Sequence, residues 1–336
     1  MKFDLGILAN EPVETIVRQV QLAESLGYDT AWIADSHLVC RELWVTLTAC
    51  ALGTRRIRLG PGVTVPHSRH VSVTASAIVS LNELAPGRIL LGIGTGDSSA
   101  GTLGLRMEKV ARVATLESMS EALRRLTSAG STRFESGSEG RIAWLDRPHR
   151  IPLYVAGSGP KMLAAAGRLG DGVIMYSSTW PPIIEAALGH IGAGAQAAGK
   201  ALDDLDVVIW APMSVAHDRA RARDHVRGRV ASAMRHPLPV PLDAEDRAAI
   251  ERVRRQYDFF QHATAASTHR ELVPDRFVDL LALAGHPDDI VERVQAIAKI
   301  PQVSRIAVLP QVPGGSFIER EQLLRLFADE VMPRVA

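Results

Sequence analysis

The chain has 336 residues, of which 46% are hydrophobic and 22% charged, a composition typical of a globular protein with a large buried core. Its formal net charge of +1 gives no reason to expect a nucleic-acid or bulk-membrane partner. The two cysteines, Cys40 and Cys50, form neither a disulfide framework nor a metal-ligand pattern. No apolar run reaches the length of a membrane span, and the N-terminus runs into a strand without a signal-peptide pattern, so we expect a cytoplasmic protein.

The first hundred or so residues alternate short apolar strands with amphipathic helices. One example is the helix that opens at Pro12, buries Ile16 and Val20 on one face, and ends at Gly27. The strands are expected at residues 3–8, 30–34, 57–59 and 89–91, and the helices at 12–26, 43–52, 71–84 and 106–126. Glycine-rich loops follow the third and fourth strands.

The second half continues this alternation around two irregular segments. Strands are expected at residues 151–155, 172–175, 207–210 and 304–309, and helices at 162–168, 182–198, 287–300 and 317–331. Residues 131–150 are rich in Gly and Ser and contain an alternating patch at 141–145, which indicates a hairpin or loop excursion. Residues 218–284 show no strand pattern and are rich in Arg and Ala, so we expect several helices inserted at the top of the fold.

Eight apolar strands alternating with helices predict an α/β fold, a (β/α)8 TIM barrel. We expect residues 1–336 to form a single barrel domain with the two insertions. A doubly wound sheet is the alternative, but its glycine fingerprint belongs in the first strand–helix turn, and residues 8–12 contain no glycine. In either fold the chemistry is expected where the strands end at their carboxyl side.

Four segments carry a recognisable pattern: residues 23–35 with AESLGYD and WIAD, residues 59–64 with LGPGVT, residues 81–97, and residues 151–172. As a set they resemble the bacterial luciferase-like superfamily of flavin- and F420-dependent oxidoreductases. TASAI at 74–78 and GIGTGD at 92–97 look most like its methylenetetrahydromethanopterin reductase branch. The resemblance covers nearly the whole chain and is weakest over residues 218–284.

The resemblance implies a barrel with a reduced flavin-type cofactor in its mouth, often as a homodimer. The expected activity is that of an F420-dependent reductase or dehydrogenase, which moves a hydride between coenzyme F420 and a small organic substrate. The alternative is a monooxygenase that uses reduced FMN and O2 in a dry pocket. A separate flavin or F420 reductase is the expected supplier of reduced cofactor. A barrel that only binds flavin is a third possibility, against which the full set of eight strands argues.

The resemblance also implies cofactor contacts. In the superfamily, Gly62 and Val63 form a bulge against the ring, with a non-proline cis peptide in several relatives; an ordinary strand-end turn is the alternative. The sequence Gly157-Ser158-Gly159 precedes a helix, where free backbone N–H groups attract a phosphate, although it could be only a tight turn. The further candidates for the ring, the tail or the entrance are Thr64, Arg69, Gly94, Thr95, Gly96 and Lys161.

Three residues are candidates for the chemistry: Asp35, His37 and Asp97. Many relatives have Asp-His at the end of the second strand, whereas this chain has Ser36 in that place and His37 one residue later. We consider His37 as a general acid or ring contact, with a solvated histidine as the alternative. Asp97 is suited to bind the ring or a substrate donor, with helix capping as the alternative. No metal is expected.

Two features bear on the cofactor and the substrate. F420 carries an oligoglutamate tail, so a basic groove formed by Arg69, Lys161 and Arg168 would favour F420 over FMN. The archaeal reductase branch has an acidic residue on the first strand near the reacting carbon, and this chain has Gly6 there. We therefore expect a related redox reaction on a different substrate.

Overall fold

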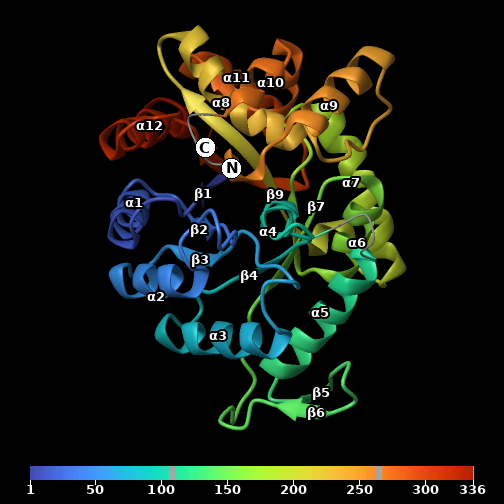
Figure 1. The fold of residues 1–336 in the computed structure, drawn as a ribbon. Coiled ribbons are helices and arrows are strands. Elements are labelled where there is room, and N and C mark those ends of the chain that lie inside the picture. The colour runs from blue at the N-terminus through green and yellow to red at the C-terminus, as the bar shows by residue number, and fades with distance from the viewer. Residues whose placement is uncertain (106–110, 262–266, 336) are drawn as a thin grey trace.

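A parallel barrel forms the centre of the molecule (Figure 1). The computed structural model describes residues 1–105, 111–261 and 267–335. In chain order the barrel strands are β1 (Lys2–Ile7), β2 (Thr30–Ile33), β3 (Arg58–Pro61), β4 (Leu91–Ile93), β7 (Leu153–Gly157), β8 (Gly172–Met175), β9 (Asp206–Val215) and β11 (Val303–Pro310). They pair in the order β3-β2-β1-β11-β9-β8-β7-β4. Parallel bridges from Leu59 to Ile89 and from Thr64 to Ile93 bring β3 beside β4, which confirms the predicted (β/α)8 barrel.

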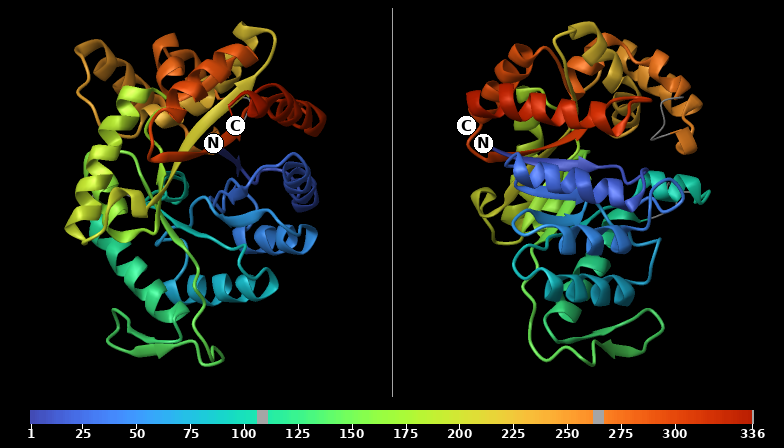
Figure 2. Two further views of the ribbon diagram at one scale, coloured as in Figure 1. Left: turned by 180° about the vertical axis from the view of Figure 1, so that it is seen from behind. Right: turned by 90° about the vertical axis from the view of Figure 1, so that its left-hand side faces the viewer.

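Helices surround the barrel (Figure 2). They are α1 (Val13–Ser25), α2 (Leu43–Gly53), α3 (Val71–Leu84), α5 (Arg112–Thr127), α6 (Pro160–Leu169), α7 (Pro181–Ala197), α11 (Pro287–Ala298) and α12 (Phe317–Glu330). A short extra helix, α4 (Asp97–Thr102), follows β4. The helix expected over residues 106–126 corresponds to α5, but residues 106–110 lie outside the described residues. Within the described ranges, no helix is long and apolar enough to cross a membrane.

The segment 131–150 contains two short antiparallel strands, β5 (Ser131–Arg133) and β6 (Glu139–Arg141). They form a small sheet that projects beyond α5 (Figure 1). The strands lie earlier than the alternating patch at 141–145, because the turn is built at Gly137, whose φ of 82° suits a glycine.

The segment 218–284 contains α8 (Arg219–Met234), α9 (Ala244–Gln256) and α10 (Asp275–Leu281), with its residues 262–266 outside the described ranges. These helices share a core of their own, which includes Val230, Val253 and Phe277. The expectation that no strand occurs there was wrong at its end. β10 (Leu283–Gly285) pairs in parallel with Met213–Val215, because β9 extends well past the predicted residue 210.

The inside of the barrel is layered. Its middle is filled by Trp32, Tyr154, Ile174, Val208 and Trp210, together with further apolar side chains. Leu8, Val63 and Tyr176 pack against this cluster from the carboxyl ends of the strands. The apolar layer therefore separates the two ends of the barrel.

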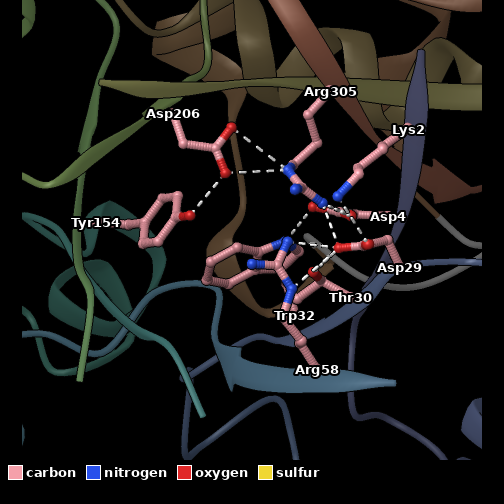
Figure 3. A network of polar contacts seen from close by, with 9 residues as sticks. All are labelled: Lys2, Asp4, Asp29, Thr30, Trp32, Arg58, Tyr154, Asp206 and Arg305. Carbon is pink, nitrogen blue, oxygen red and sulfur yellow. Dashed lines mark hydrogen bonds and ion pairs between the residues drawn. The ribbon is translucent and has the colours of Figure 1, made fainter. Parts of the chain in front are cut away.

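The amino-terminal end of the barrel is closed by a polar network centred on Arg305 (Figure 3). Arg305 Nη1 donates to Asp4 Oδ1 at 2.8 Å and to Asp29 Oδ2 at 2.5 Å, and its Nε donates to Asp206 Oδ2 at 3.2 Å. Trp32 Nε1 donates to Asp4 Oδ2 at 2.9 Å. Because chemistry in parallel barrels lies at the opposite end, we interpret this network as structural.

Candidate functional site

A cavity of about 1010 Å³ lies at the carboxyl ends of the barrel strands. It is bordered by the residues that follow β2, β3, β4, β7 and β8, and by α8 from the insertion. Of the residues predicted from the sequence, it is lined by Asp35, Gly62, Val63, Gly94, Thr95, Gly96, Asp97, Gly157, Ser158, Gly159 and Lys161. The fold thus brings together loops more than 100 residues apart in the chain, as the strand order requires.

In the cavity wall formed after β3 and β4, neighbouring side chains pack directly against the backbone and leave no room for a further side chain. The peptide between Gly62 and Val63 is cis. A Cβ added at Gly62 would lie 2.9 Å from the Trp210 ring, and one added at Gly94 would lie 2.5 Å from Val63 Cγ2. Only glycine fits these two positions without rearrangement, and the resulting smooth wall allows a flat ring to approach the backbone.

The Asp35 side chain is held in place by hydrogen bonds from Thr64 and Arg69. Its Oδ2 accepts hydrogen bonds from Thr64 Oγ1 at 2.8 Å and from Arg69 Nη1 at 2.6 Å. Arg69 Nη2 also donates to Glu42 at 2.7 Å. Thr64 and Arg69 do not line the cavity, since both are engaged in holding Asp35. Asp35 Oδ1 is buried and has no hydrogen-bond partner among the described residues, so it is the oxygen left for a ligand.

His37 is not part of the cavity lining, whereas Ser36 is. Ser36 Oγ lies 2.6 Å from Ser98 Oγ, which joins the end of β2 to the first turn of α4. His37 Nδ1 is buried without a hydrogen-bond partner in the described part of the chain. With Ser36 in the place that the histidine has in many relatives, His37 lies outside the cavity lining, and we do not assign it a role in the chemistry.

The loop from Gly157 to Gly159 leads from β7 into α6. Gly159 is the N-cap and Pro160 the first residue of this helix, so no side chain caps its first turn. The backbone there is therefore suited to bind an anion, and Lys161 lines the cavity beside it. Pro237 packs directly against this loop: a Cβ added at Gly159 would lie 2.8 Å from Pro237 Cβ.

The basic groove expected from Arg69, Lys161 and Arg168 does not form. Arg69 is paired with Asp35 and Glu42, and Arg168 with Glu117, so only Lys161 of the three reaches the cavity. Both arginines lie next to carboxylates that the strand-end loops and α5 bring beside them. The positive charges at the cavity wall are instead those of Lys161, Arg112, Arg229 and Arg235.

Asp97 lies in a charged cluster at the start of α4. Its carboxylate is 3.6 Å from Arg112, 3.7 Å from Arg235 and 3.8 Å from His236. Burial opposes ionisation of Asp97, but His236 and the arginines outweigh it and hold the pKa of this carboxyl below its usual range. Burial lowers the pKa of His236, so its ring is neutral at neutral pH. Asp97 Oδ1 has no hydrogen-bond partner among the described residues.

The insertion contributes the residues that the sequence did not indicate. Arg229, Ser232 and Arg235 follow one another at helical spacing and all line the cavity. Arg235 also stacks on Tyr257 and Phe259, with its guanidinium 4.2 and 4.3 Å from the ring centroids. The three-residue spacing of Arg229, Ser232 and Arg235 was visible in the sequence, but nothing there indicated which face of α8 meets the barrel.

Among the described residues, no group of three or more His, Cys, Asp or Glu side chains is arranged to hold a metal ion. His67 and His70, which are close in the sequence, have separate contacts. His67 Nε2 lies 2.8 Å from Ser99 Oγ, and His70 caps α3 by accepting from the backbone N–H of Ser72.

The family model and the sequence relatives of this chain agree with one another. The family model described as luciferase-like monooxygenase matches residues 1–301. The 5,10-methylenetetrahydromethanopterin reductase of Archaeoglobus fulgidus is 33% identical, covering 100% of both chains. The F420-dependent glucose-6-phosphate dehydrogenase of Beutenbergia cavernae is 31% identical over 94% of this chain and 91% of its own.

Solved structures agree with these relatives. The coenzyme F420 dependent tetrahydromethanopterin reductase of Methanopyrus kandleri superposes with a TM-score of 0.82 at 26% identity, covering 100% of this chain and 99% of that one. An F420-dependent secondary alcohol dehydrogenase superposes with a TM-score of 0.79 at 18% identity, covering 100% of both chains, which supports the fold. The family model and the full-length relatives together show that the chain belongs to the luciferase-like monooxygenase family.

Proposed function

We propose that the chain is an F420-dependent oxidoreductase that transfers a hydride between the deazaflavin and a small organic substrate. The observation that carries this proposal is full-length similarity to proteins named as F420-dependent. The family itself also contains oxygen-using enzymes, so the choice of F420 over FMN needs support from the residues of this chain and from a binding experiment.

The cavity residues fit a flavin-type cofactor. A volume of about 1010 Å³ is at the upper end of small-molecule sites and accommodates a tricyclic ring with a side chain. The glycine-built wall at Gly62 and Gly94 would lie against the ring, and the loop Gly157–Gly159 with Lys161 would hold the phosphate. When bound, F420 supplies a carbon that donates or accepts a hydride and does not activate oxygen.

The chain supplies proton acceptors and donors beside that ring. Asp97 stays ionised at neutral pH, so we expect its Oδ1 to accept the proton that leaves a substrate hydroxyl, or to return it in the reducing direction. Tyr176 lines the same cavity, and its hydroxyl is buried without a partner among the described residues. Asp35, fixed by Arg69, would orient the ring rather than move a proton.

The substrate is proposed to differ from that of the archaeal reductases. A Cβ at Gly6 would lie 2.9 Å from the Trp210 ring and 3.2 Å from Leu309. Trp210 therefore occupies the space that an acidic side chain on β1 would need. This explains physically why position 6 carries no carboxylate in this chain.

The experiment that tests the cofactor is equilibrium binding of F420 and of FMN to the purified chain, followed by tryptophan fluorescence. We expect F420 to bind and FMN to bind much more weakly, with Trp210 in the cavity wall as the expected reporter. Lys161→Met should weaken F420 binding by roughly tenfold, because it removes a charge-assisted contact to an anion. Lys299→Met, on the exposed end of α11, is the matched control and should have no effect.

FMN binding without F420 binding would overturn the hydride-transfer proposal and favour the monooxygenase. Failure to bind either cofactor would contradict both. A cytoplasmic location and a separate reductase that regenerates the cofactor stay predictions.

We also propose a homodimer formed through α2 and α3, which pack side by side. Both helices expose apolar side chains, namely Val45, Leu52, Val73 and Leu84. Sedimentation equilibrium should give twice the chain mass, and Leu52→Asp should shift it toward the monomer. Ile318→Asp, an equally exposed apolar position on α12, should leave the dimer intact. A monomeric wild type would contradict this assembly.

A further inference from the structure

A second cavity, of about 570 Å³, lies beside the candidate functional site. It is located where β1 and β11 end, and it is bordered by residues of α1, α8 and α12 and by the loop of residues 310–315. Leu8 lines both this cavity and the main one, so a ligand bound here would lie next to the contents of the main cavity. The proposed hydride transfer does not use this space.

Two buried polar side chains border the second cavity without a partner. Ser267 is 4% exposed, and its Oγ has no hydrogen-bond partner among the described residues. Gln19 of α1 is 8% exposed, and no hydrogen bond joins its side-chain amide to another described residue. A buried hydroxyl or amide without a partner is unfavourable, because it has given up its hydrogen bonds to bulk water. The two groups therefore favour a ligand that supplies hydrogen bonds inside this cavity.

The charged groups that border the second cavity are balanced within the protein. Glu11 accepts a hydrogen bond from Arg320, and Arg229 has an interaction of its own. Burial lowers the pKa of His225, so its ring is neutral at neutral pH, and both of its nitrogens lie within 3.5 Å of polar side-chain atoms. Among the described residues, the cavity thus offers hydrogen-bonding groups rather than an ion that lacks a partner.

The loop of residues 310–315 is held by its own contacts. Gln311 Nε2 donates to the backbone oxygens of Leu309 at 3.1 Å and of Pro310 at 2.9 Å. The backbone N–H of Gly315 donates to the oxygen of Val312 at 3.0 Å, and a Cβ added at Gly315 would lie 2.2 Å from Val312 Cγ1. Because this wall is already formed, little conformational entropy is lost when a ligand binds against it.

We propose that the second cavity binds an uncharged cyclic polyol through the side chains of Gln19 and Ser267. A hydroxyl group both donates and accepts, so neighbouring hydroxyls of one ring pair with the amide N–H and C=O of Gln19 and with the Ser267 hydroxyl. A ketone only accepts, and an ion would be desolvated here without a counter-charge. Ile7, Leu8 and Val312 supply apolar surface for the ring carbons. This site is separate from the proposed cofactor site and does not depend on the proposed function.

The test is a titration of the purified chain, without cofactor, followed by saturation-transfer difference NMR. The probes are trans-1,2-cyclohexanediol, cyclohexanone and cyclohexanecarboxylate, which share a six-membered ring and differ in its polar group. We expect the diol to bind about tenfold more tightly than either of the other two, because only the diol both donates and accepts without carrying a charge. Equal or tighter binding of the ketone or the carboxylate would overturn the proposal. Absence of diol binding would also overturn it, because water alone would then satisfy the two side chains.

Two variants place the bound diol. Ser267→Ala and Gln19→Leu should each weaken diol binding by about three- to tenfold, since each removes a hydrogen bond. Gln21→Leu is the matched control on the exposed side of α1, where the Gln21 amide donates to the backbone oxygen of Gly53, and it should leave diol binding unchanged. If Gln19→Leu does not fold, Ser267→Ala provides the test alone. Diol binding that the folded variants leave unchanged would contradict this site.

F420 separates this proposal from the proposed function. The cofactor is expected in the main cavity, so the diol should still bind when F420 is added. Displacement of the diol by F420 would place the diol in the main cavity and overturn the proposal. If the chain binds no F420, the proposed function fails, whereas diol binding that Ser267→Ala weakens still supports the second site.

Discussion

Arg69 holds the buried carboxylate of Asp35 at the end of β2, and this pair gives the first prediction. The Asp35 side chain has no exposed surface, and that of Arg69 is 14% exposed. Replacing Arg69 by methionine leaves a buried charge without its cation, so we expect the free energy of unfolding to fall by about 3–5 kcal/mol. Urea unfolding measures this loss. Asp35→Asn in the same chain should recover part of the stability, since it removes the orphaned charge.

Arg125→Met is the control for this prediction, because Arg125 pairs with Glu121 one turn away on the exposed face of α5. Such pairs contribute about 0.3–0.5 kcal/mol, so the change should be small. Thr64 Oγ1 still donates to Asp35 in Arg69→Met, so F420 affinity should fall only modestly in the folded variant. A large loss of F420 affinity without a loss of stability would instead support the cofactor contact that the sequence suggested for Arg69.

The residues of the candidate site were predictable from the sequence to different degrees. Gly62, Asp97 and Gly157 each follow a recognisable strand, and the barrel brings all strand ends to one side. The partner of Arg69 was not predictable, because it depends on how two loops pack. Arg229 was not predictable either, since the position of α8 over the barrel depends on the long segment between β9 and α11.

At the scale of elements, α6 and α7 approach each other closely through glycines. A Cβ at Gly194 would lie 1.8 Å from the backbone oxygen of Ala164, and one at Gly167 would lie 2.1 Å from that of Ile191. Gly194→Ala must therefore push the helices apart, and we expect it to lower the free energy of unfolding by about 1–3 kcal/mol. Chemical denaturation followed by circular dichroism measures this change.

Gly189→Ala on the same helix provides the matched comparison. Nothing lies within 4 Å of a Cβ at Gly189, which is exposed. Alanine has the higher helix propensity, so this variant should gain about 0.5–1 kcal/mol. A lower free energy of unfolding in both variants would show that α7 needs flexibility at these positions. An unchanged free energy of unfolding in Gly194→Ala would show that the helices separate without cost.

The elements themselves were largely predictable, because strand and helix periodicities differ and the barrel repeats the same unit. The structure differs from the prediction where contacts between segments far apart in the chain, or the geometry of a turn, determine which residues form a strand. β10 has only three residues and forms because the long β9 offers it a free edge. The strands of the 131–141 hairpin are set by the turn at Gly137, not by the apolar alternation that follows it.

At the scale of the whole molecule, the two ends of the barrel have different tasks. The carboxyl ends carry the candidate functional site, whereas the amino ends are joined by the network around Arg305 (Figure 3). This network connects β1, β2, β7, β9 and β11 through the side chains of one arginine, three aspartates, a tryptophan and a tyrosine. Its charge state should therefore influence the stability of the entire barrel.

Asp4 makes this influence measurable through pH. Burial raises the pKa of Asp4 to about 6, and Arg305 only partly offsets it, because Arg305 is shared with Asp29 and Asp206. In the unfolded chain the pKa of an aspartate is about 3.9. Between these two values the folded chain binds more protons than the unfolded chain, so the contribution of Asp4 to stability rises as the pH falls from about 6 toward 4.

Asp4→Asn removes this titration while keeping the shape of the side chain. The stability of the wild type relative to Asp4→Asn should therefore increase by roughly 1 kcal/mol between pH 7 and pH 5. Urea unfolding of both proteins at the two pH values measures the difference, in which the titrating groups that do not interact with Asp4 cancel. A difference that stays constant would mean that Asp4 titrates alike in both states. A difference that decreases would mean that Arg305 outweighs burial, so that the network stabilises the charged carboxylate.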